Sequence, residues 1–480
     1  MKSYLISCST FLMLLVALLT TPACTPKVSK SLTSDDVWNE VPRILQQIKA
    51  PDFRDKDYVI TAYGAVGDGS ANCSDAFKKA IAACNKEGGG RVVVPQGTFL
   101  TGPIHLKSNV NLHVVKGGKI LFSTKPEDYL PLVYTRWEGI ELMNYSPFIY
   151  AFEQKNIAIT GEGIIDGQSN ETNWWPWKGN LQDGWKPGTP NQNDKDKRPA
   201  LFEMAEKGVP VAERKFGPGF YLRPQFVQPY RCENVLIEGV TFINSPMWIL
   251  NPVLCNNVTI QKVKVESHGP NNDGCDPESC KNVLIRDCYF NTGDDCIAIK
   301  SGRNADGRKI NIPSENIIIQ ACKMANGHGG IVIGSEISGG VRNVFAENCN
   351  MSSPELDRAL RIKTSSARGG VTENIYMRNI EVGQVKEEVV IATMLYEDAG
   401  NYMPTIRNIE VKNMRVRQGG KYGVRLEAYK ESPIQNIRLI NVTIDTVKTP
   451  YKFTNARDVR FENVSINGQK VEVKQVNGEW

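Results

Sequence analysis

The sequence predicts an all-β fold, a right-handed parallel β-helix with a helix capping its N-terminal end, and three observations support this prediction. A short motif, Asn followed by alternating apolar residues, recurs along most of the chain. From Asn234 onward its copies are 23, 25, 34, 27, 31, 34, 28 and 22 residues apart, an irregular period that suits stacked coils joined by loops of varying length. A second Asn, Asp or Gly often follows within each unit, where a turn between two strands is expected.

Each copy of the motif spans about five residues with period-two alternation, which is typical of a β-strand. The copies begin at Asn156, Asn234, Asn257, Asn282, Asn316, Asn343, Asn374, Asn408, Asn436 and Asp458. The second turn residues are Asp287, Asn348, Asn379, Asn413, Asn441 and Asn463. Amides stacked on successive coils can hydrogen-bond in a ladder. A propeller and a Leu-rich horseshoe are the alternatives, but the chain has neither a blade signature nor a Leu-x-x-Leu-x-Leu repeat.

The first residues have the features of an export signal. Met1-Lys2 is followed by an apolar run, residues 11–19, which is too short for a permanent membrane span and ends at Pro22-Ala23-Cys24. We expect a signal peptide over residues 1–23. Cys24 is a candidate lipidated first residue of a bacterial lipoprotein, with ordinary cleavage nearby as the alternative. These features predict an exported protein, periplasmic or anchored in the outer membrane of a Gram-negative bacterium.

Two helices are predicted before the main repeat. Residues 34–48 combine cap residues with helical spacing, within a tether-and-helix segment 24–57, and we expect this helix near the N-terminal end of the coils. The second helix runs from Asp75 to Lys86. A helix laid across an open solenoid end blocks unpaired strand edges and exposed core. The second helix is therefore the predicted cap of a single β-helix domain over residues 58–480.

The repeat is interrupted between residues 168 and 225 by a stretch rich in Trp, Pro, Gly, Lys and Asp. It contains Trp174-Trp175-Pro176-Trp177 and a helical pattern from Pro199 to Lys207. A loop this long inside a compact domain is usually functional or disordered, and clustered Trp residues argue against disorder. Two interpretations stay open: a wall that closes one end of a groove, and a flap that packs its Trp side chains on the coils.

Composition limits the classes of partner. The net charge is +5 with both signs interspersed, and no basic run with interleaved aromatic residues predicts nucleic-acid binding. Of the 12 cysteines, most of those beyond Cys24 are expected to be buried free thiols in a monomer. The alternative is that Cys275 and Cys280, which flank the acidic cluster at residues 271–274, form a disulfide that pins the loop of that cluster. Cys-x-x-Cys metal spacing is absent.

Four polar clusters fall on successive units of the repeat. They are Asn271-Asn272-Asp273-Gly274, Gly293-Asp294-Asp295, Gly327-His328-Gly329 and Arg361-Ile362-Lys363. The key residue of each cluster follows the Asn of its unit by 12 to 18 residues. Because neighbouring coils stack at about 4.8 Å, residues in similar phase should line one groove. Three carboxylates, an imidazole and two cations are the groups that acid/base hydrolysis of an acidic sugar requires.

Each cluster alone has an ordinary structural explanation, since Asn-Asp-Gly and Gly-Asp-Asp are common in turns. Together they favour catalysis. Glycosidases that invert the anomeric centre hold two carboxylates roughly 6.5 to 9.5 Å apart, which neighbouring coils can provide. The like-charge pair Asp294 and Asp295 should raise the pKa of one member, as a general acid needs.

The cationic cluster points to an acidic ligand. Arg361 and Lys363 lie two apart on a predicted strand, so their side chains point the same way and can bind one carboxylate. A metal site built from the three Asp and His328 is the chemical rival, but two cations in the same groove disfavour it. A calcium-dependent lyase meets the same objection. We therefore expect no metal and no cofactor.

At these residues the chain resembles a known family. Asn-x-Asp, Gly-Asp-Asp, Gly-His-Gly and Arg-Ile-Lys, in this order, are similar to the motifs of the polygalacturonases and related pectin hydrolases of glycoside hydrolase family 28, over roughly residues 58–467. The resemblance implies the pectin-lyase-like solenoid. It implies Asp294 as general acid, Asp273 with Asp295 as the groups that activate water, and His328 as a group that orients the acid. The substrate-binding residues it implies are Arg361, Lys363, Asn271 and Tyr396.

The resemblance and the residues together predict an inverting hydrolase of α-1,4-galacturonosyl linkages in pectic polysaccharide. Exo action on oligogalacturonides is expected, because the 168–225 insertion can close one end of the groove and a periplasmic location suits imported oligosaccharides. One alternative is a galacturonidase that acts on rhamnogalacturonan or other branched pectin. Another, of a different class, is a non-catalytic β-helix that only binds carbohydrate.

Overall fold

The computed structural model describes residues 37–473 and 477–478. The predicted export signal and Cys24 lie outside these residues. Val41–Trp480 form one compact unit, distinct from Met1–Glu40, and the fold below is that of the larger unit. Within the described ranges, no helix combines the length and apolarity needed to cross a membrane.

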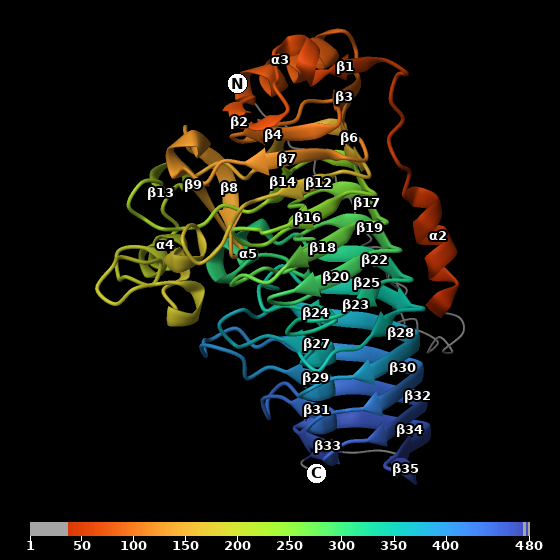
Figure 1. Cartoon of the computed structure of the whole chain (residues 1–480). Helices are drawn as coiled ribbons and strands as arrows, with labels where there is room; N and C mark the ends of the chain where they lie inside the picture. The colour runs from red at the N-terminus through yellow and green to blue at the C-terminus, as the bar shows by residue number, and fades with distance from the viewer. Residues whose placement is uncertain (1–36, 474–476, 479–480) are drawn as a thin grey trace, which may run out of the picture. The chain divides into compact units, whose positions relative to one another are not determined.

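The chain winds through three stacks of parallel strands, so the predicted parallel β-helix is confirmed (Figure 1). The first stack carries the Asn motif, and its strands pair in chain order. Its members are β1 (Asp57–Val59), β3 (Gly90–Val94), β6 (Val110–Val114), β11 (Lys155–Gly161), β15 (Glu233–Glu238), β17 (Asn256–Gln261), β19 (Lys281–Arg286), β22 (Ser314–Gln320), β25 (Val341–Glu347), β28 (Val371–Gln384), β30 (Thr405–Gln418), β32 (Ile434–Thr446) and β34 (Ala456–Ile466).

The second stack follows the turn after each motif strand and merges into β28, which pairs with both β25 and β26. Its separate strands are β2 (Asp68–Asn72), β4 (Gly97–Thr101), β7 (Gly118–Phe122), β12 (Ile164–Asp166), β16 (Thr241–Ile243), β18 (Lys264–Ser267), β20 (Tyr289–Thr292), β23 (Lys323–Met324) and β26 (Asn350–Met351). The merging explains why the last coils have strands of 13 and 14 residues.

The third stack closes each coil. Its strands are β5 (Ile104–His105), β10 (Ile149–Phe152), β14 (Val227–Tyr230), β21 (Ile297–Ile299), β24 (Ile331–Ile333), β27 (Arg358–Lys363), β29 (Glu388–Thr393), β31 (Tyr422–Glu427) and β33 (Thr449–Thr454). Isolated bridges through Leu250 and Cys275 continue the stack between β14 and β21. This third stack positions the functional residues.

The predicted Asn ladder forms along the turn between the third and first stacks. Each motif Asn adopts a left-handed conformation, with φ between 53° and 62°, and most donate to the side-chain oxygen of the Asn one coil below, as Asn343 does to Asn316 at 3.2 Å. A second ladder runs through Asn348, Asn379, Asn413, Asn441 and Asn463. Asn tolerates this conformation better than other residues with a Cβ atom, so one residue type supplies both the turn and the inter-coil bond.

The N-terminal end is covered by helix α3 (Ser74–Lys86), which confirms the predicted cap (Figure 1). Its buried face consists of Ala76, Phe77, Ala80, Ile81 and Cys84. At the other end, β35 (Gln469–Val473) and β36 (Asn477–Gly478) pair antiparallel with β34. These two strands cover the last strand of the first stack.

The helix before the coils, α2 (Glu40–Gln47), docks elsewhere than expected. Just after it, the Lys49 amide donates to Asn257 Oδ1 at 2.9 Å, and Asn257 Nδ2 donates back to the Lys49 carbonyl at 2.8 Å. Asn257 belongs to the ladder on β17, so Lys49 lies against a middle coil and not near the N-terminal end. Helical spacing identified the helix but contains no information about where it packs.

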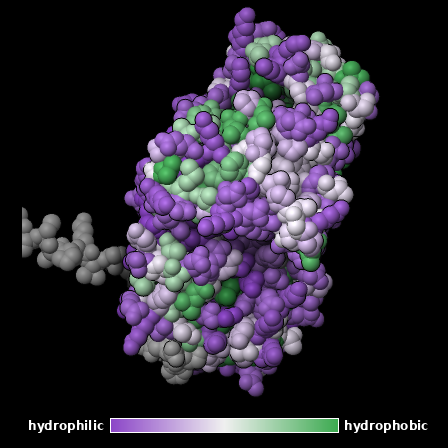
Figure 2. All heavy atoms as spheres, turned by 90° about the vertical axis from the view of Figure 1, so that its left-hand side faces the viewer, coloured by the Kyte–Doolittle hydropathy of each residue, from purple (hydrophilic) through white to green (hydrophobic). Residues whose placement is uncertain are grey.

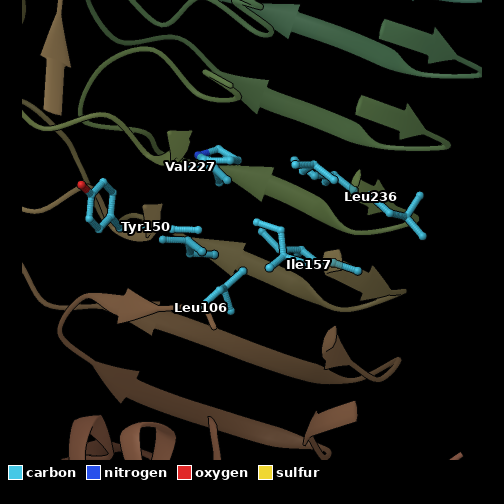
Figure 3. A pocket seen from close by; sticks show the side chains of 12 residues that line it. Leu106, Tyr150, Ile157, Val227 and Leu236 are labelled. Carbon is cyan, nitrogen blue, oxygen red and sulfur yellow. The ribbon is translucent and has the colours of Figure 1, made fainter. Parts of the chain in front are cut away.

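The interior of the coils is filled by apolar side chains from all three stacks. Figure 3 shows one small apolar pocket of about 10 Å³, where Leu106, Ile157 and Val227 meet. All ten cysteines in the described range are buried and free. The expectation of buried thiols is therefore confirmed, and the alternative Cys275–Cys280 disulfide is wrong.

A lobe beside the coils contains the predicted insertion. Its elements are β8 (Val133–Trp137), β9 (Ile140–Asn144), η3 (Trp175–Lys178), η4 (Leu181–Asp183), α4 (Arg198–Glu206), η5 (Val211–Glu213), β13 (Lys215–Phe216) and α5 (Asn304–Ile310). The remaining short helices are η1 (Ile60–Tyr63) and η2 (Pro126–Tyr129). Trp137, Leu201, Phe216 and Trp248 share one buried cluster, which fixes the lobe to the coil that carries Trp248.

Candidate active site

The third stack brings the predicted clusters together where its strands begin. Asp294 and Asp295 precede β21, and His328 precedes β24. Bridges and strand pairs align Cys275 with Ile297, Ile297 with Ile331, and Ile331 with Leu360. Asp273 and Asp295 therefore occupy equivalent positions on neighbouring coils, each two residues before the aligned one.

One cleft of about 270 Å³ contains these side chains. Its lining is almost entirely charged or polar: Glu138, Lys178, Arg198, Trp248, Asn271, Asp273, Asp294, Lys300, Arg303, His328, Ser335, Glu336, Arg361, Lys363, Tyr396 and Glu397. The side of the molecule that bears β24, β27 and the lobe is seen in Figure 2, where hydrophilic side chains predominate. Such a lining suits a polar, charged ligand better than an apolar one.

Three carboxylates meet in the cleft. Asp273, Asp294 and Asp295 each place one oxygen within 4.8 Å of the others. The nearest oxygens are therefore closer than the 6.5 to 9.5 Å predicted for an inverting pair. Oxygens this close could hold a cation, but each carboxylate is already bonded to a protein cation. This pairing disfavours the metal alternative.

Asp294 is paired with His328. The imidazole Nδ1 lies 2.9 Å from Asp294 Oδ1, and the His328 amide donates to the Asp294 carbonyl at 3.1 Å. Burial raises the pKa of Asp294, but the bond to His328 and the charges of His328, Lys363 and Lys300 hold it well below its usual range. The same bond raises the pKa of His328 to about 9. At neutral pH the free cleft thus contains an imidazolium beside a carboxylate.

Asp295 is bonded to both predicted sugar-binding cations. Lys363 Nζ lies 2.8 Å from Asp295 Oδ2 and Arg361 Nη1 lies 3.3 Å from Oδ1. Burial opposes ionisation of Asp295, yet Lys363 and Arg361 lower its pKa. Both cations also lie over the Tyr396 ring, 5.2 and 5.4 Å from its centroid. Arg361, Lys363 and Tyr396 therefore form one continuous patch beside the carboxylates.

Asp273 is the one of these three carboxyls whose pKa is raised, and the pKa of the neighbouring Asp276 is raised as well. Burial and the charge of Asp294 raise its pKa to about 7, although Lys300 opposes this. Lys300 Nζ lies 3.4 Å from Asp273, Asp276 and Glu336 alike. The sequence predicted a raised pKa within the Asp294–Asp295 pair, and that prediction is wrong: both values are lowered. The negative charge of Asp294 raises the pKa of Asp273 on the neighbouring coil. The nearby cations lower the pKa values of Asp294 and Asp295.

The Asn271-Asn272 turn holds Asp273 in place. Asn272 is buried, and its Oδ1 accepts from the Gly269 amide at 3.0 Å and from Ser267 Oγ at 2.5 Å. Asn271 has φ 54°, and its Oδ1 accepts from Lys178 and Arg223, both at 2.8 Å. Because its oxygen is occupied, the Asn271 amide presents its NH₂ group as the donor for a ligand.

The insertion supports both interpretations through different residues. Trp174 is buried against Phe148, with ring centroids 5.8 Å apart, and Trp175 donates to the Ser245 carbonyl at 2.9 Å, so these Trp side chains pack on the coils. Lys178 and Arg198 line the cleft, so the same segment also forms a wall.

Several cleft residues were not identified from the sequence. They are Glu138, Lys178, Arg198, Trp248, Asp276, Lys300, Arg303 and Glu336. The sequence could have indicated Lys300, since it follows directly on the apolar strand after Asp294 and Asp295. Lys178 and Arg198 had none, because the conformation of the insertion could not be predicted.

A parallel β-helix with three acidic side chains and a charged cleft on one face defines a class of protein, the polysaccharide-cleaving β-helix enzymes. The family model of glycosyl hydrolases family 28 matches residues 220–476. The chain belongs to this family and is therefore an enzyme that acts on O-glycosyl bonds. A second model, rhamnogalacturonase A/epimerase, pectate lyase-like, matches residues 59–113, which carry the N-terminal coils.

Individual relatives agree with this family assignment. A solved structure, the hyperthermoactive exopolygalacturonase from Thermotoga maritima, is 48% identical with a TM-score of 0.90, over 92% of this chain and 99% of that one. The exo-poly-alpha-D-galacturonosidase of Dickeya chrysanthemi is 28% identical over 85% of this chain and 70% of its own length. The probable polygalacturonase of Vitis vinifera is 28% identical over 83% and 77%.

Proposed function

We propose that this protein is an exo-acting polygalacturonase, which hydrolyses α-1,4-galacturonosyl linkages at the end of oligogalacturonides. The observation that carries the proposal is the meeting of three carboxylates within 4.8 Å beside the Arg361, Lys363 and Tyr396 patch, in a cleft walled by the insertion. The similarity to exo-acting relatives supports it. No feature favours a branched-pectin substrate or a purely binding role.

Asp294 is the general acid of the proposed reaction. It donates a proton to the glycosidic oxygen as the bond from that oxygen to the anomeric carbon breaks. In the free cleft this proton is on His328, 2.9 Å from Asp294 Oδ1. A bound sugar displaces water, and because loss of solvation disfavours both charged groups, it favours transfer of the proton from imidazolium to carboxylate. His328 thus supplies and orients the proton that Asp294 delivers.

Asp273 and Asp295 activate the water. One of them accepts a proton from the water as its oxygen bonds to the anomeric carbon from the face opposite the leaving group, which inverts that carbon. The nearest carboxylate oxygens lie within 4.8 Å of one another, and the anomer of the product tests inversion directly. Proton NMR of the first product should show the β-anomer; an initial α-anomer would refute inversion.

Arg361 and Lys363 bind the carboxylate of a galacturonate unit. They lie two residues apart on β27, and strand geometry places their side chains on the same face. Both are bonded to Asp295, and Arg361 retains further donors for a ligand. The Tyr396 ring beneath them offers an apolar surface against which a sugar ring can pack.

Digestion of defined oligogalacturonides tests the proposal directly. Products are resolved over time and reducing-end release is compared with that from rhamnogalacturonan. We expect the substrate shortened by one terminal unit from the first time points, and slow release from rhamnogalacturonan. An early ladder of mid-length oligomers would refute exo action, and no release from any galacturonan would refute the activity.

We also propose export of a monomer, with Cys24 as a lipid-anchor site. The apolar run 11–19 followed by Ala23-Cys24 supports this. Fractionation of cells that produce the wild type or Cys24→Ala tests it. The wild type should be membrane-bound and the variant released into the periplasm; release of both would refute the anchor. Light scattering of the released protein should give the mass of one chain.

A further inference from the structure

Lys178 differs from the other cations of the cleft. Arg198, Lys300, Arg303, Arg361 and Lys363 each lie within 4.0 Å of a carboxylate oxygen. Among the residues that the structure describes, no carboxylate lies that close to Lys178. Within the same described residues, the only hydrogen bond of the Lys178 ammonium group is to the neutral amide oxygen of Asn271, at 2.8 Å. Its ammonium group therefore has donors that remain available to a ligand.

The backbone of Lys178 is fixed by the aromatic residues that precede it. Lys178 ends η3, and Trp174 at the start of this turn is buried. The Trp177 ring packs edge-on against Trp174, with centroids 4.8 Å apart. Asn193 Nδ2 donates to the Lys178 carbonyl at 2.8 Å. The Trp-rich motif thus anchors a lysine whose side chain lines the cleft, and a preorganised cation binds with less loss of entropy.

A second unpaired cation lies beside it. Arg223 is fully buried and donates to Asn271 Oδ1 at 2.8 Å and to the Pro246 and Pro270 carbonyls. In the described chain it forms no ion pair. Two cations that have no carboxylate oxygen within 4.0 Å in the described chain therefore share one amide oxygen. A buried charge without a counter-ion is costly, so an incoming anion is favoured at this place.

Burial of Lys178 also favours an incoming anion. It lowers the pKa of Lys178, with Arg223 and Arg198 adding to the effect and Glu138 opposing it. An ammonium that has lost part of its hydration gains more from a carboxylate than an exposed one does. The Asn271 NH₂ group lies at the same place and can donate a further hydrogen bond.

We propose that Lys178 and Asn271 bind the carboxylate of the terminal galacturonate, on the walled side of the cleft, while Arg361 and Lys363 bind the carboxylate of the neighbouring unit. This inference rests on the proposed function. It deepens that function, since two separate carboxylate-binding places make the enzyme select two adjacent uronic acids and not one. The insertion would then serve recognition of the chain end in addition to blocking the groove.

The test uses two oligogalacturonides that differ only in the terminal unit, which is galacturonate in one and neutral galactose in the other. The wild type should prefer the acidic terminus by about 10- to 100-fold in kcat/KM, the range of a charge-assisted hydrogen bond. Lys178→Met should reduce this preference to within about threefold, mainly through KM. Lys178→Arg should keep most of it, because the charge is retained.

Lys186→Met is the matched control, since Lys186 is an exposed lysine of the same insertion and should leave the preference unchanged. A Lys178→Met enzyme that keeps the wild-type preference would overturn the inference. So would a wild type that does not discriminate between the two termini, a result that needs no variant to fold. If the wild type fails to cut the unmodified oligogalacturonide, the proposed function itself fails, which is a distinguishable result.

Discussion

Polar side chains are stacked on successive coils in two places, the Asn ladder (the ladder flank) and the cleft (the cleft flank), and the stacking has opposite effects on stability in the two places. On the ladder flank, amides are neutral and each donates to the next, as Asn316 does to Asn282 at 3.1 Å and Asn343 to Asn316 at 3.2 Å. On the cleft flank, the stacked groups are carboxylates within 4.8 Å of one another. Buried oxygens of Asp273 and Asp276 lack any hydrogen-bond partner in the described chain.

The difference shows that the repeat determines only where side chains meet, while their chemistry decides whether the meeting stabilises the fold. A ladder of amides satisfies every polar group it buries. A stack of carboxylates crowds like charges, which raises the pKa of Asp273 and makes its ionised form unfavourable to the fold. We expect substitution of Asp273 and substitution of a ladder Asn to change stability in opposite directions.

The largest effect is expected from Asp294→Asn. Without a carboxyl at this position no group delivers the proton to the leaving oxygen, and kcat should fall by about 10²- to 10⁴-fold. The matched control is Asp287→Asn, because Asp287 occupies a ladder-type turn with φ 55° and should keep wild-type activity. Near-normal turnover by the Asp294 variant would contradict the acid assignment.

Asp273→Asn should abolish most activity and yet stabilise the protein at high pH. The folded pKa of Asp273, about 7, lies above the ordinary value of 3.8 for this side chain. A raised pKa gives a contribution that is present below pH 3.8 and is lost as pH rises through 7. With about 1.4 kcal/mol per pKa unit, the variant should be more stable than the wild type by about 2–4 kcal/mol at pH 8 and equal below pH 4. Unfolding in urea across this pH range measures it.

Asn316→Ala should lower stability by about 2–3 kcal/mol. It removes two inter-coil hydrogen bonds and leaves a Cβ residue in a left-handed turn, φ 59°. Asn316→Gly separates the effect of the hydrogen bonds from that of the backbone conformation, since glycine adopts a positive φ without strain and loses only the hydrogen bonds. Thermal or urea unfolding reports both. If the alanine and glycine variants are equally stable, the backbone term is absent.

The smallest predicted effect is a shift in pH dependence. His328 retains its proton up to a pKa of about 9 through its bond to Asp294, so the alkaline limb of kcat/KM should lie near that pH. His328→Gln leaves the proton on Asp294 alone, and the limb should move to lower pH by at least about one unit. His113→Gln, on strand β6 of the ladder-bearing stack, serves as the control. If the alkaline limb of kcat/KM does not move in His328→Gln, then His328 and Asp294 do not act together.

The ladder flank was predictable from sequence because its rule is local. An Asn before alternating apolar residues predicts a turn, the strand after it and which side chains of that strand point into the core. Helix α3 was predicted from the helical spacing of Phe77, Ala80 and Cys84. The position of α2 was not predictable, because the contact of Lys49 with Asn257 joins segments 208 residues apart that share no pattern.

The cleft flank was predictable only in part. Phase along the repeat brought Asp273, Asp294 and His328 to one place, since coil geometry alone requires it. The part of the insertion that lines the cleft could not be predicted from the sequence, because Trp packing within an irregular segment determines the position of Lys178. The protonation states were also wrong in sequence reasoning, because burial and cations from other coils outweigh the neighbour in the chain.

The most direct test of the central claim is to unfold Asp273→Asn and Asn316→Ala side by side in urea at pH 8, with activity measured on the same samples. We expect a higher unfolding midpoint with lost activity for Asp273→Asn, and a lower midpoint with retained activity for Asn316→Ala. A lowered midpoint for both would contradict the claim that the cleft trades stability for catalysis.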